Sequence, residues 1–299
     1  MLIAATFASC QKPAANITPT ATAGDQPELE KRLAAICDRT QGSVSVAVTH
    51  IETGRTASVN AKASLRLYSV FKLPVAIAVL KEVEANRLKI DQLVHVTPED
   101  IVPGAPENTA LWQKPVDRTI AELIEVMIAR SDNTSTDKLV RLIGGPKRVT
   151  DEMRALGFNN INVYFSRVDL PDARQNPNTG SAEDIVNLLV QLQKGKILQP
   201  AQTKLLIDYM QRTTTGPKRL RGDLPEGIVV AHKTGSGERD PKNNVPKSTN
   251  DVGLITLPNG LGNLAIAVLI SDSKLPDTAQ EKVIAELARA AYDSFVNGN

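Results

Sequence analysis

The order of strand and helix patterns is the feature that most constrains the fold of this 299-residue chain. Small polar and apolar residues alternate over 43–50, and strand-like runs occur at 55–60, 228–233, 251–257 and 264–271. Helical spacing of apolar residues fills the middle of the chain, at 71–86, 119–130, 135–143, 146–156, 181–194 and 201–212. Helical patterns also open the ordered part at 28–40 and close it at 278–296. The chain is therefore expected to form an α/β fold in which a helical insertion interrupts one sheet domain.

Three parts follow from this order. Residues 1–27 combine a short apolar run with a segment rich in Pro, Thr and Ala, which predicts a signal or lipoprotein remnant and a flexible tether. Residues 28–67 and 214–299 are expected to form the sheet domain, and residues 68–213 an all-helical domain that includes a long loop at 158–180. A site is expected at the junction, because pockets commonly form between such units.

The composition excludes several classes of function. Basic and acidic residues number 35 and 33, and aromatic residues make up only 3%, so neither a basic stripe nor stacking rings support binding to nucleic acid. The two cysteines and three widely separated histidines do not form the spacing of a metal site. We therefore expect neither a metal nor another cofactor. The protein is also expected to be a monomer.

Cys10 ends the apolar run of residues 2–9 and only loosely resembles a lipid-attachment motif. We expect an exported protein that is periplasmic, or tethered to the bacterial envelope through a lipid on Cys10. The alternative is a frayed tail with an incidental cysteine. Cys37, between apolar neighbours, is expected to be a small buried residue.

Ser69 and Lys72 are the first candidates for chemistry. At the start of a helix, positions i and i+3 share a face, so a serine nucleophile and a lysine base would lie within reach of each other. The lysine serves as a base only if burial lowers its pKa, and the apolar run that follows would bury it. The pattern is weak alone, since Ser271 and Lys274 repeat it, and the alternative is a surface pair.

Two further motifs stand in order after it: Ser131-Asp132-Asn133 follows a helical pattern, and Lys233-Thr234-Gly235 follows a strand pattern. With these three motifs, residues 28–296 resemble the class A serine β-lactamases and the penicillin-binding proteins of the same fold. The stretches 68–74 and 214–225, together with Thr249-Asn250-Asp251, are most similar to the extended-spectrum branch found in Bacteroidetes. The resemblance implies a β-lactamase/transpeptidase-like fold, with an antiparallel sheet flanked by helices and an all-α insertion.

The resemblance also implies roles for individual residues. Ser69 would attack the lactam carbonyl, Lys72 would accept its proton directly or through water, and Ser131 would relay a proton to the leaving nitrogen. The backbone N–H groups of Ser69 and Ser236 would form the oxyanion hole. Asn133 would hold the substrate's side-chain amide.

The substrate carboxylate would be bound by Lys233, Thr234, Gly235 and Ser236. The family's usual arginine position on the following strand holds no arginine here, and Arg219 is the expected substitute.

The sequence departs from the family at the deacylation base, because the loop 158–180 is short and lacks the usual glutamate. Asp169 follows Arg167 at the family's Arg-x-acid spacing and is the candidate replacement. An aspartate is one methylene shorter, and a misplacement of about 1 Å can cost roughly a hundredfold in rate. The alternative is that Asp169 forms an ion pair with Arg167 or Arg174.

This departure leaves three functions open. The first is a β-lactamase that hydrolyses the β-lactam ring, and the second is a D-alanyl-D-alanine carboxypeptidase that deacylates β-lactams slowly. The third is a lipoprotein that binds β-lactams without turnover. His232 is expected to be structural, because it should point away from the site on an alternating strand. Trp112 is expected either to pack in the core or to contact a substrate ring.

Overall fold

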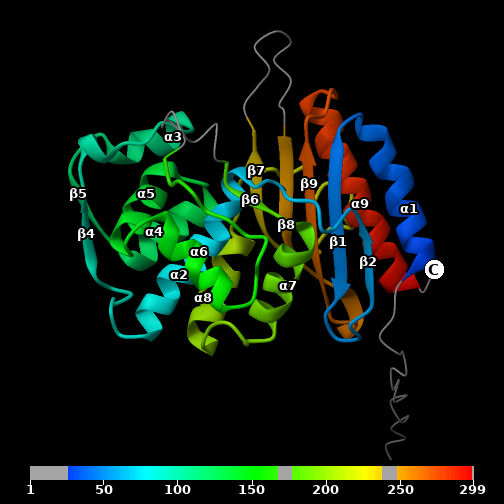
Figure 1. Ribbon diagram of the computed structural model, residues 1–299, viewed down its shortest axis with the longest axis horizontal. Helices are drawn as coiled ribbons and strands as arrows, with labels where there is room; N and C mark the ends of the chain where they lie inside the picture. The colour runs from blue at the N-terminus through cyan, green and yellow to red at the C-terminus, as the bar shows by residue number, and fades with distance from the viewer. Residues whose placement is uncertain (1–25, 168–176, 238–247, 298–299) are drawn as a thin grey trace, which may run out of the picture.

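A five-stranded antiparallel sheet forms the centre of the protein (Figure 1), in the order β2-β1-β9-β8-β7. The computed structural model describes residues 26–167, 177–237 and 248–297. The strands are β1 (Ser43–His50), β2 (Thr56–Val59), β7 (Val230–Ser236), β8 (Ser248–Thr256) and β9 (Asn263–Ser271). The sheet is thus built from both ends of the chain, with the helical residues inserted between β2 and β7.

Two terminal helices, α1 (Pro27–Cys37) and α9 (Asp277–Asn297), cover one face of the sheet and lie side by side. Leu29 and Leu33 of α1 are one helical turn apart and buried in the same cluster as Ile266 and Val268 of β9. This apolar stripe holds α1 on the sheet, because tertiary packing rather than intrinsic propensity stabilises a helix of this length. Cys37 is buried, as predicted.

The opposite face is covered by α7 (Ala182–Gln193), which packs on β1 and β9, and α8 (Pro200–Gln211), which packs on β7. Ala265, Ala267 and Leu269 of β9 belong to this second core, whereas the residues between them face the first. Because both faces are covered, β9 is apolar along almost its whole length.

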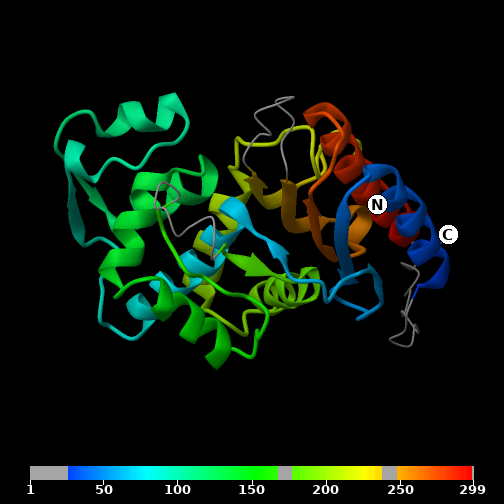
Figure 2. The same ribbon diagram turned by 45° about the horizontal axis from the view of Figure 1, so that its top comes forward.

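The helical region lies beside the sheet, blue-green to green in Figure 2, and α2 (Lys72–Glu84) is its central helix. Helices α4 (Ile120–Ala129), α5 (Asn133–Leu142) and α6 (Pro146–Ala155) pack against it. Every residue from Lys72 to Leu80 is buried, so this part of α2 lies in the core and has no solvent face. This placement buries Lys72, the first residue of α2, and puts Ser69 in the segment just before it.

The predicted elements are present with small shifts at their ends. The strand at 43–50 is confirmed, and the six helices predicted in the middle of the chain end within two residues of their predicted bounds. The sequence pattern did not predict the short helix α3 (Pro106–Thr109) or two small sheets, β3 (Leu65–Arg66) with β6 (Thr179–Gly180) and β4 (Leu93–Val96) with β5 (Val116–Thr119). These strands are short and partly exposed, so they carry little alternation. Among the described helices, none combines the length and apolar character needed to span a membrane.

Candidate active site

Ser69 lies in a short 3₁₀ segment, η2 (Tyr68–Phe71), that leads directly into α2. Tyr68 has φ +46°, a left-handed conformation that a residue with a side chain adopts only where its surroundings hold it. The Val70 amide donates to the Leu67 carbonyl oxygen at 3.1 Å and closes the turn. Ser69 is half-buried and lies just before the N-terminus of α2.

Lys72, one turn further along, is only 1% exposed. Its ammonium group donates to the Ser131 carbonyl oxygen at 2.6 Å, to Asn133 Oδ1 at 2.7 Å and to Ser131 Oγ at 3.3 Å. Three donors thus meet three acceptors, as a buried lysine requires. These contacts bring the first and second motifs together, although they are far apart in the sequence.

Ser131 lies between α4 and α5 in a left-handed conformation, with φ +59°. The next residue, Asp132, caps α5 by accepting the Ser135 amide at 2.6 Å. Asp132 also accepts a hydrogen bond from Trp112 Nε1 at 3.2 Å. Trp112 is 1% exposed, so it packs in the core, and its hydrogen bond to Asp132 stabilises the turn that carries Ser131.

Lys233 brings the third motif to the same hydroxyl. It lies on β7, is fully buried, and donates to Ser131 Oγ at 3.0 Å and to the Thr234 carbonyl oxygen at 2.9 Å. Ser131 Oγ therefore accepts hydrogen bonds from both Lys72 and Lys233. With its two lone pairs used in this way, its own proton can be donated to a third group.

Burial controls the charge of both lysines. Removal from water lowers the pKa of Lys72 to about 7, although the nearby Asp132 carboxylate opposes the shift. Burial also lowers the pKa of Lys233 well below its ordinary value, and the neighbouring charge of Lys72 lowers it further. Lys72 is thus partly unprotonated near neutral pH, which is the state that a general base needs.

Gly235 allows β7 to pass close to the Ser69 turn. A Cβ at this position would lie 2.5 Å from the Leu67 carbonyl oxygen and 3.3 Å from the Ser69 amide nitrogen. Only glycine fits such a backbone approach without displacing the turn. Ser69 and Ser236, the predicted oxyanion-hole residues, therefore lie on adjoining segments of backbone.

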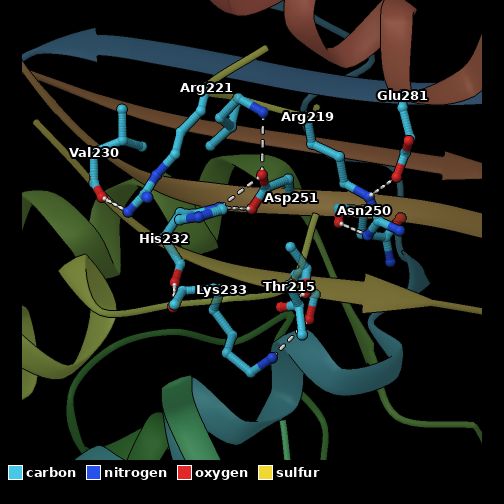
Figure 3. A network of polar contacts seen from close by, with 12 residues as sticks. Thr215, Arg219, Arg221, Val230, His232, Lys233, Asn250, Asp251 and Glu281 are labelled. Carbon is cyan, nitrogen blue, oxygen red and sulfur yellow. Dashed lines mark hydrogen bonds and ion pairs between the residues drawn. The ribbon is translucent and has the colours of Figure 1, made fainter. Parts of the chain in front are cut away.

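Arg219 lies beside this strand and is 8% exposed. It donates through Nη1 to the carbonyl oxygens of Gly235, at 3.1 Å, and Asn250, at 3.0 Å, and through Nη2 to Ser236 Oγ at 2.8 Å. Its Nε lies 3.3 Å from Glu281 Oε1 on α9 (Figure 3). Within the described part of the chain, four of its five N–H donors have partners, and the second N–H of Nη2, beside Ser236, has none.

Thr234 and Asn133, the remaining predicted binding residues, both have partners within the protein. Thr234 Oγ1 lies 2.5 Å from Thr215 Oγ1. Asn133 accepts Lys72 at Oδ1 and donates through Nδ2 to the Pro103 carbonyl oxygen at 2.6 Å. A substrate amide at Asn133 would have to share or displace these contacts.

Asp169 lies outside the described residues. The nearest described part of its loop is anchored by Asp137, a buried carboxylate that the sequence analysis did not single out. Ser166 Oγ donates to Asp137 Oδ1 at 2.6 Å, and Arg167 Nη1 lies 3.8 Å from Oδ2. Residues 166 and 167 are thus held on α5.

His232 and Lys233 extend to opposite sides of β7 (Figure 3), as strand alternation predicts. The His232 ring is fully buried, with Nδ1 2.9 Å from both carboxylate oxygens of Asp251. Asp251 also accepts the Leu220 amide at 3.1 Å. This pair therefore joins β7 and β8 to the loop that carries Arg219.

Sequence reasoning did not assign roles to Asn250, Glu281 or Thr215. Asn250 lies in a stretch that carried the resemblance, so a signal existed for it. Glu281 had no local signal, because it is one of several charged residues in an amphipathic helix and only the fold brings it to Arg219.

The structure brings together a serine just before a helix, a buried lysine one turn further along that helix and a second buried lysine on β7, an arrangement typical of a serine hydrolase. A family model described as "Beta-lactamase enzyme family" matches residues 28–295. The extended-spectrum β-lactamase PER-1 of Pseudomonas aeruginosa is 32% identical over 276 residues, covering 91% of this chain and 88% of that protein. A β-lactamase of Bacteroides uniformis is 29% identical, covering 93% and 95% of the two chains.

Among solved structures, that of the TLA-1 extended-spectrum β-lactamase superposes with a TM-score of 0.85 at 34% identity, covering 90% of this chain and 99% of that one. The chain belongs to the β-lactamase enzyme family, in its class A serine branch. These relationships favour hydrolysis of β-lactams over the carboxypeptidase and binding-only alternatives.

Proposed function

We propose that the protein hydrolyses β-lactams through an acyl-enzyme on Ser69. The observation that carries this proposal is that Lys72 of the first motif and Lys233 of the third both donate a hydrogen bond to Ser131 Oγ of the second. Ser69 Oγ would attack the lactam carbonyl carbon and pass its proton to the neutral Lys72 amine. The lowered pKa of Lys72 supports this step at neutral pH.

The C–N bond of the lactam then breaks, and the nitrogen must gain a proton. Ser131 is suited to deliver it, since its hydroxyl is replenished from the lysine ammonium groups that donate to it. The amides of Ser69 and Ser236 would stabilise the oxyanion, and removing one such donor typically costs about 10²–10³ in rate.

Lys233, Thr234, Gly235, Ser236 and the remaining donor of Arg219 would bind the substrate carboxylate, and Asn133 its amide. A substrate carboxylate beside Lys233 would favour the charged form of this lysine, and burial would then strengthen the contacts of the carboxylate with Lys233 and Arg219. We further propose Asp169 as the base that activates water for deacylation, on the spacing that it shares with the family's glutamate.

Mass spectrometry over seconds to hours tests the reaction. A penicillin adduct on the Ser69 peptide should form and then disappear as product accumulates, and Ser69→Ala should form none. An adduct that persists without product would identify a penicillin-binding peptidase or sensor instead. Asp169→Asn should prolong the adduct, and unchanged turnover would remove Asp169 from the mechanism.

Export, with or without a lipid on Cys10, belongs to the same proposal, since an apolar run at 2–9 and a segment rich in Pro, Thr and Ala precede the enzyme domain. The mass of the mature protein purified from its host envelope distinguishes the alternatives, because two or more acyl chains add a mass that a cleaved signal does not. A monomer is expected in solution and is checked by light scattering.

A further inference from the structure

We propose that the side chain of Asn250 is a positioning residue for the Ser69 turn. It is fully buried on β8. Its Nδ2 donates to the carbonyl oxygens of Arg66, at 2.8 Å, and Leu67, at 3.2 Å. Its Oδ1 accepts the Ile270 amide at 3.0 Å, so the whole amide group is engaged. The proposal rests on Ser69 as the nucleophile.

The two carbonyl groups that Asn250 holds come immediately before the left-handed Tyr68. A residue with a side chain keeps this conformation only when its neighbours constrain it. The Leu67 amide is also fixed, because it donates to the Asn178 carbonyl oxygen at 2.9 Å. Asn250 therefore fixes the carbonyl groups of Arg66 and Leu67, the two residues from which the turn starts.

The turn sets the direction of the Ser69 amide, which is a proposed oxyanion donor. The Leu67 carbonyl oxygen accepts Asn250 Nδ2 and also lies close to Gly235, the register partner of Asn250. If the Asn250 donor is lost, the Leu67 carbonyl oxygen keeps only the Val70 amide of the turn itself, and the Arg66 carbonyl oxygen loses its Asn250 partner. The turn is then held less firmly on β8, and a shift of the turn displaces the Ser69 amide. A displacement of about 1 Å is enough to cost roughly a hundredfold in rate.

The main chain of Asn250 has a separate contact, since its carbonyl oxygen accepts Arg219 Nη1 at 3.0 Å. Side-chain variants leave this acceptor in place. Loss of the amide should therefore slow acylation whether or not the substrate carries the carboxylate that Arg219 would bind.

The experiment compares Asn250→Asp and Asn250→Ala with the native protein. Asn250→Asp keeps an acceptor for the Ile270 amide but replaces the Nδ2 donor by an oxygen, which cannot donate to the Arg66 and Leu67 carbonyl groups while it is ionised. Single-turnover acylation is followed by rapid-quench mass spectrometry with a penicillin and with its methyl ester. We expect acylation to slow about tenfold to a hundredfold, by the same factor for both substrates.

Protonation of the new carboxyl in Asn250→Asp restores a donor toward the carbonyl groups. The deficit relative to the native protein should therefore narrow as the pH falls, a response that loss of packing alone would not produce. The control is Ser45→Ala, at a fully buried serine of β1, which removes the hydrogen bond from Ser45 Oγ to the Asn60 carbonyl oxygen at 3.0 Å. It should acylate at the native rate.

Native acylation rates in a folded Asn250→Ala protein, checked by thermal unfolding, would overturn the proposal. So would a loss confined to the carboxylate-bearing penicillin, or an equal loss in Ser45→Ala. If the native protein itself formed no adduct on Ser69, the proposed function would fail instead, and the two failures are thereby distinguished.

Discussion

Replacing Lys72 with methionine tests the burial of the active-site lysine, because it removes the charge but keeps an unbranched side chain. In the folded protein the pKa of Lys72 is lowered to about 7 by burial, against an ordinary value of 10.5. Between these values the unfolded chain binds a proton that the folded chain has released. The stability of the native protein therefore rises with pH across this interval, through this group.

The size of the effect follows from the two pKa values. The lowered pKa of Lys72 reduces the stability of the folded protein by roughly 5 kcal/mol at pH 6, where the folded state holds the proton, and by roughly 1–2 kcal/mol at pH 9.5, where folding must release it. The stability gain of Lys72→Met over the native protein should thus be about 3 kcal/mol larger at pH 6 than at pH 9.5. The contacts that the neutral Lys72 amine makes do not depend on pH and cancel in the difference, whereas the hydrogen bonds of the ammonium to Ser131 and Asn133 are already contained in the pKa. Removing Lys72 also relieves Lys233, which acts in the same direction.

Urea unfolding at the two pH values, followed by the fluorescence of the buried Trp112, measures this difference. The control is Lys31→Met, at an exposed lysine of α1 paired with Glu28. The argument that burial lowers the pKa of Lys72 would be refuted if the difference in unfolding free energy between Lys72→Met and the native protein changed by less than about 1 kcal/mol between the two pH values. In the native enzyme the same titration predicts that acylation rises with pH through about 7.

Three further predictions follow from individual contacts. Gly235→Ala places a methyl group 2.5 Å from the Leu67 carbonyl oxygen, so acylation should fall about a hundredfold or more in single-turnover assays; near-native rates would show that the turn yields. Glu281→Gln weakens one contact of Arg219, so KM for a penicillin should rise about twofold to tenfold with kcat nearly unchanged, and an equal rise for its methyl ester would contradict the link to the carboxylate. Leu33→Ala empties a fully buried site under α1 and should lower the free energy of unfolding by about 2–5 kcal/mol in urea titrations, with acylation retained; a loss below about 1 kcal/mol would mean that α1 collapses into the space.

Local patterns in the sequence were sufficient for most of the fold. The strand at 43–50 and the helices of the middle region have strong periodicity, because each packs one or both faces against a core. The short strands β4 and β5 were missed for the opposite reason: Leu93 is 64% exposed, so burial imposes little pattern on them.

The sequence alone determined the chemical groups of the site, because Ser69, Lys72, Ser131 and Lys233 stand in short motifs whose local geometry is set by a helix start, a turn and a strand. Only the tertiary structure decided how these groups act on one another. Burial of Lys72 and Lys233 around one hydroxyl lowers both pKa values, and the closure of the sheet brings Glu281 to Arg219 and Asn250 to the Ser69 turn. Such contacts depend on desolvation and on distances between residues remote in sequence, and neither quantity is encoded in a local pattern.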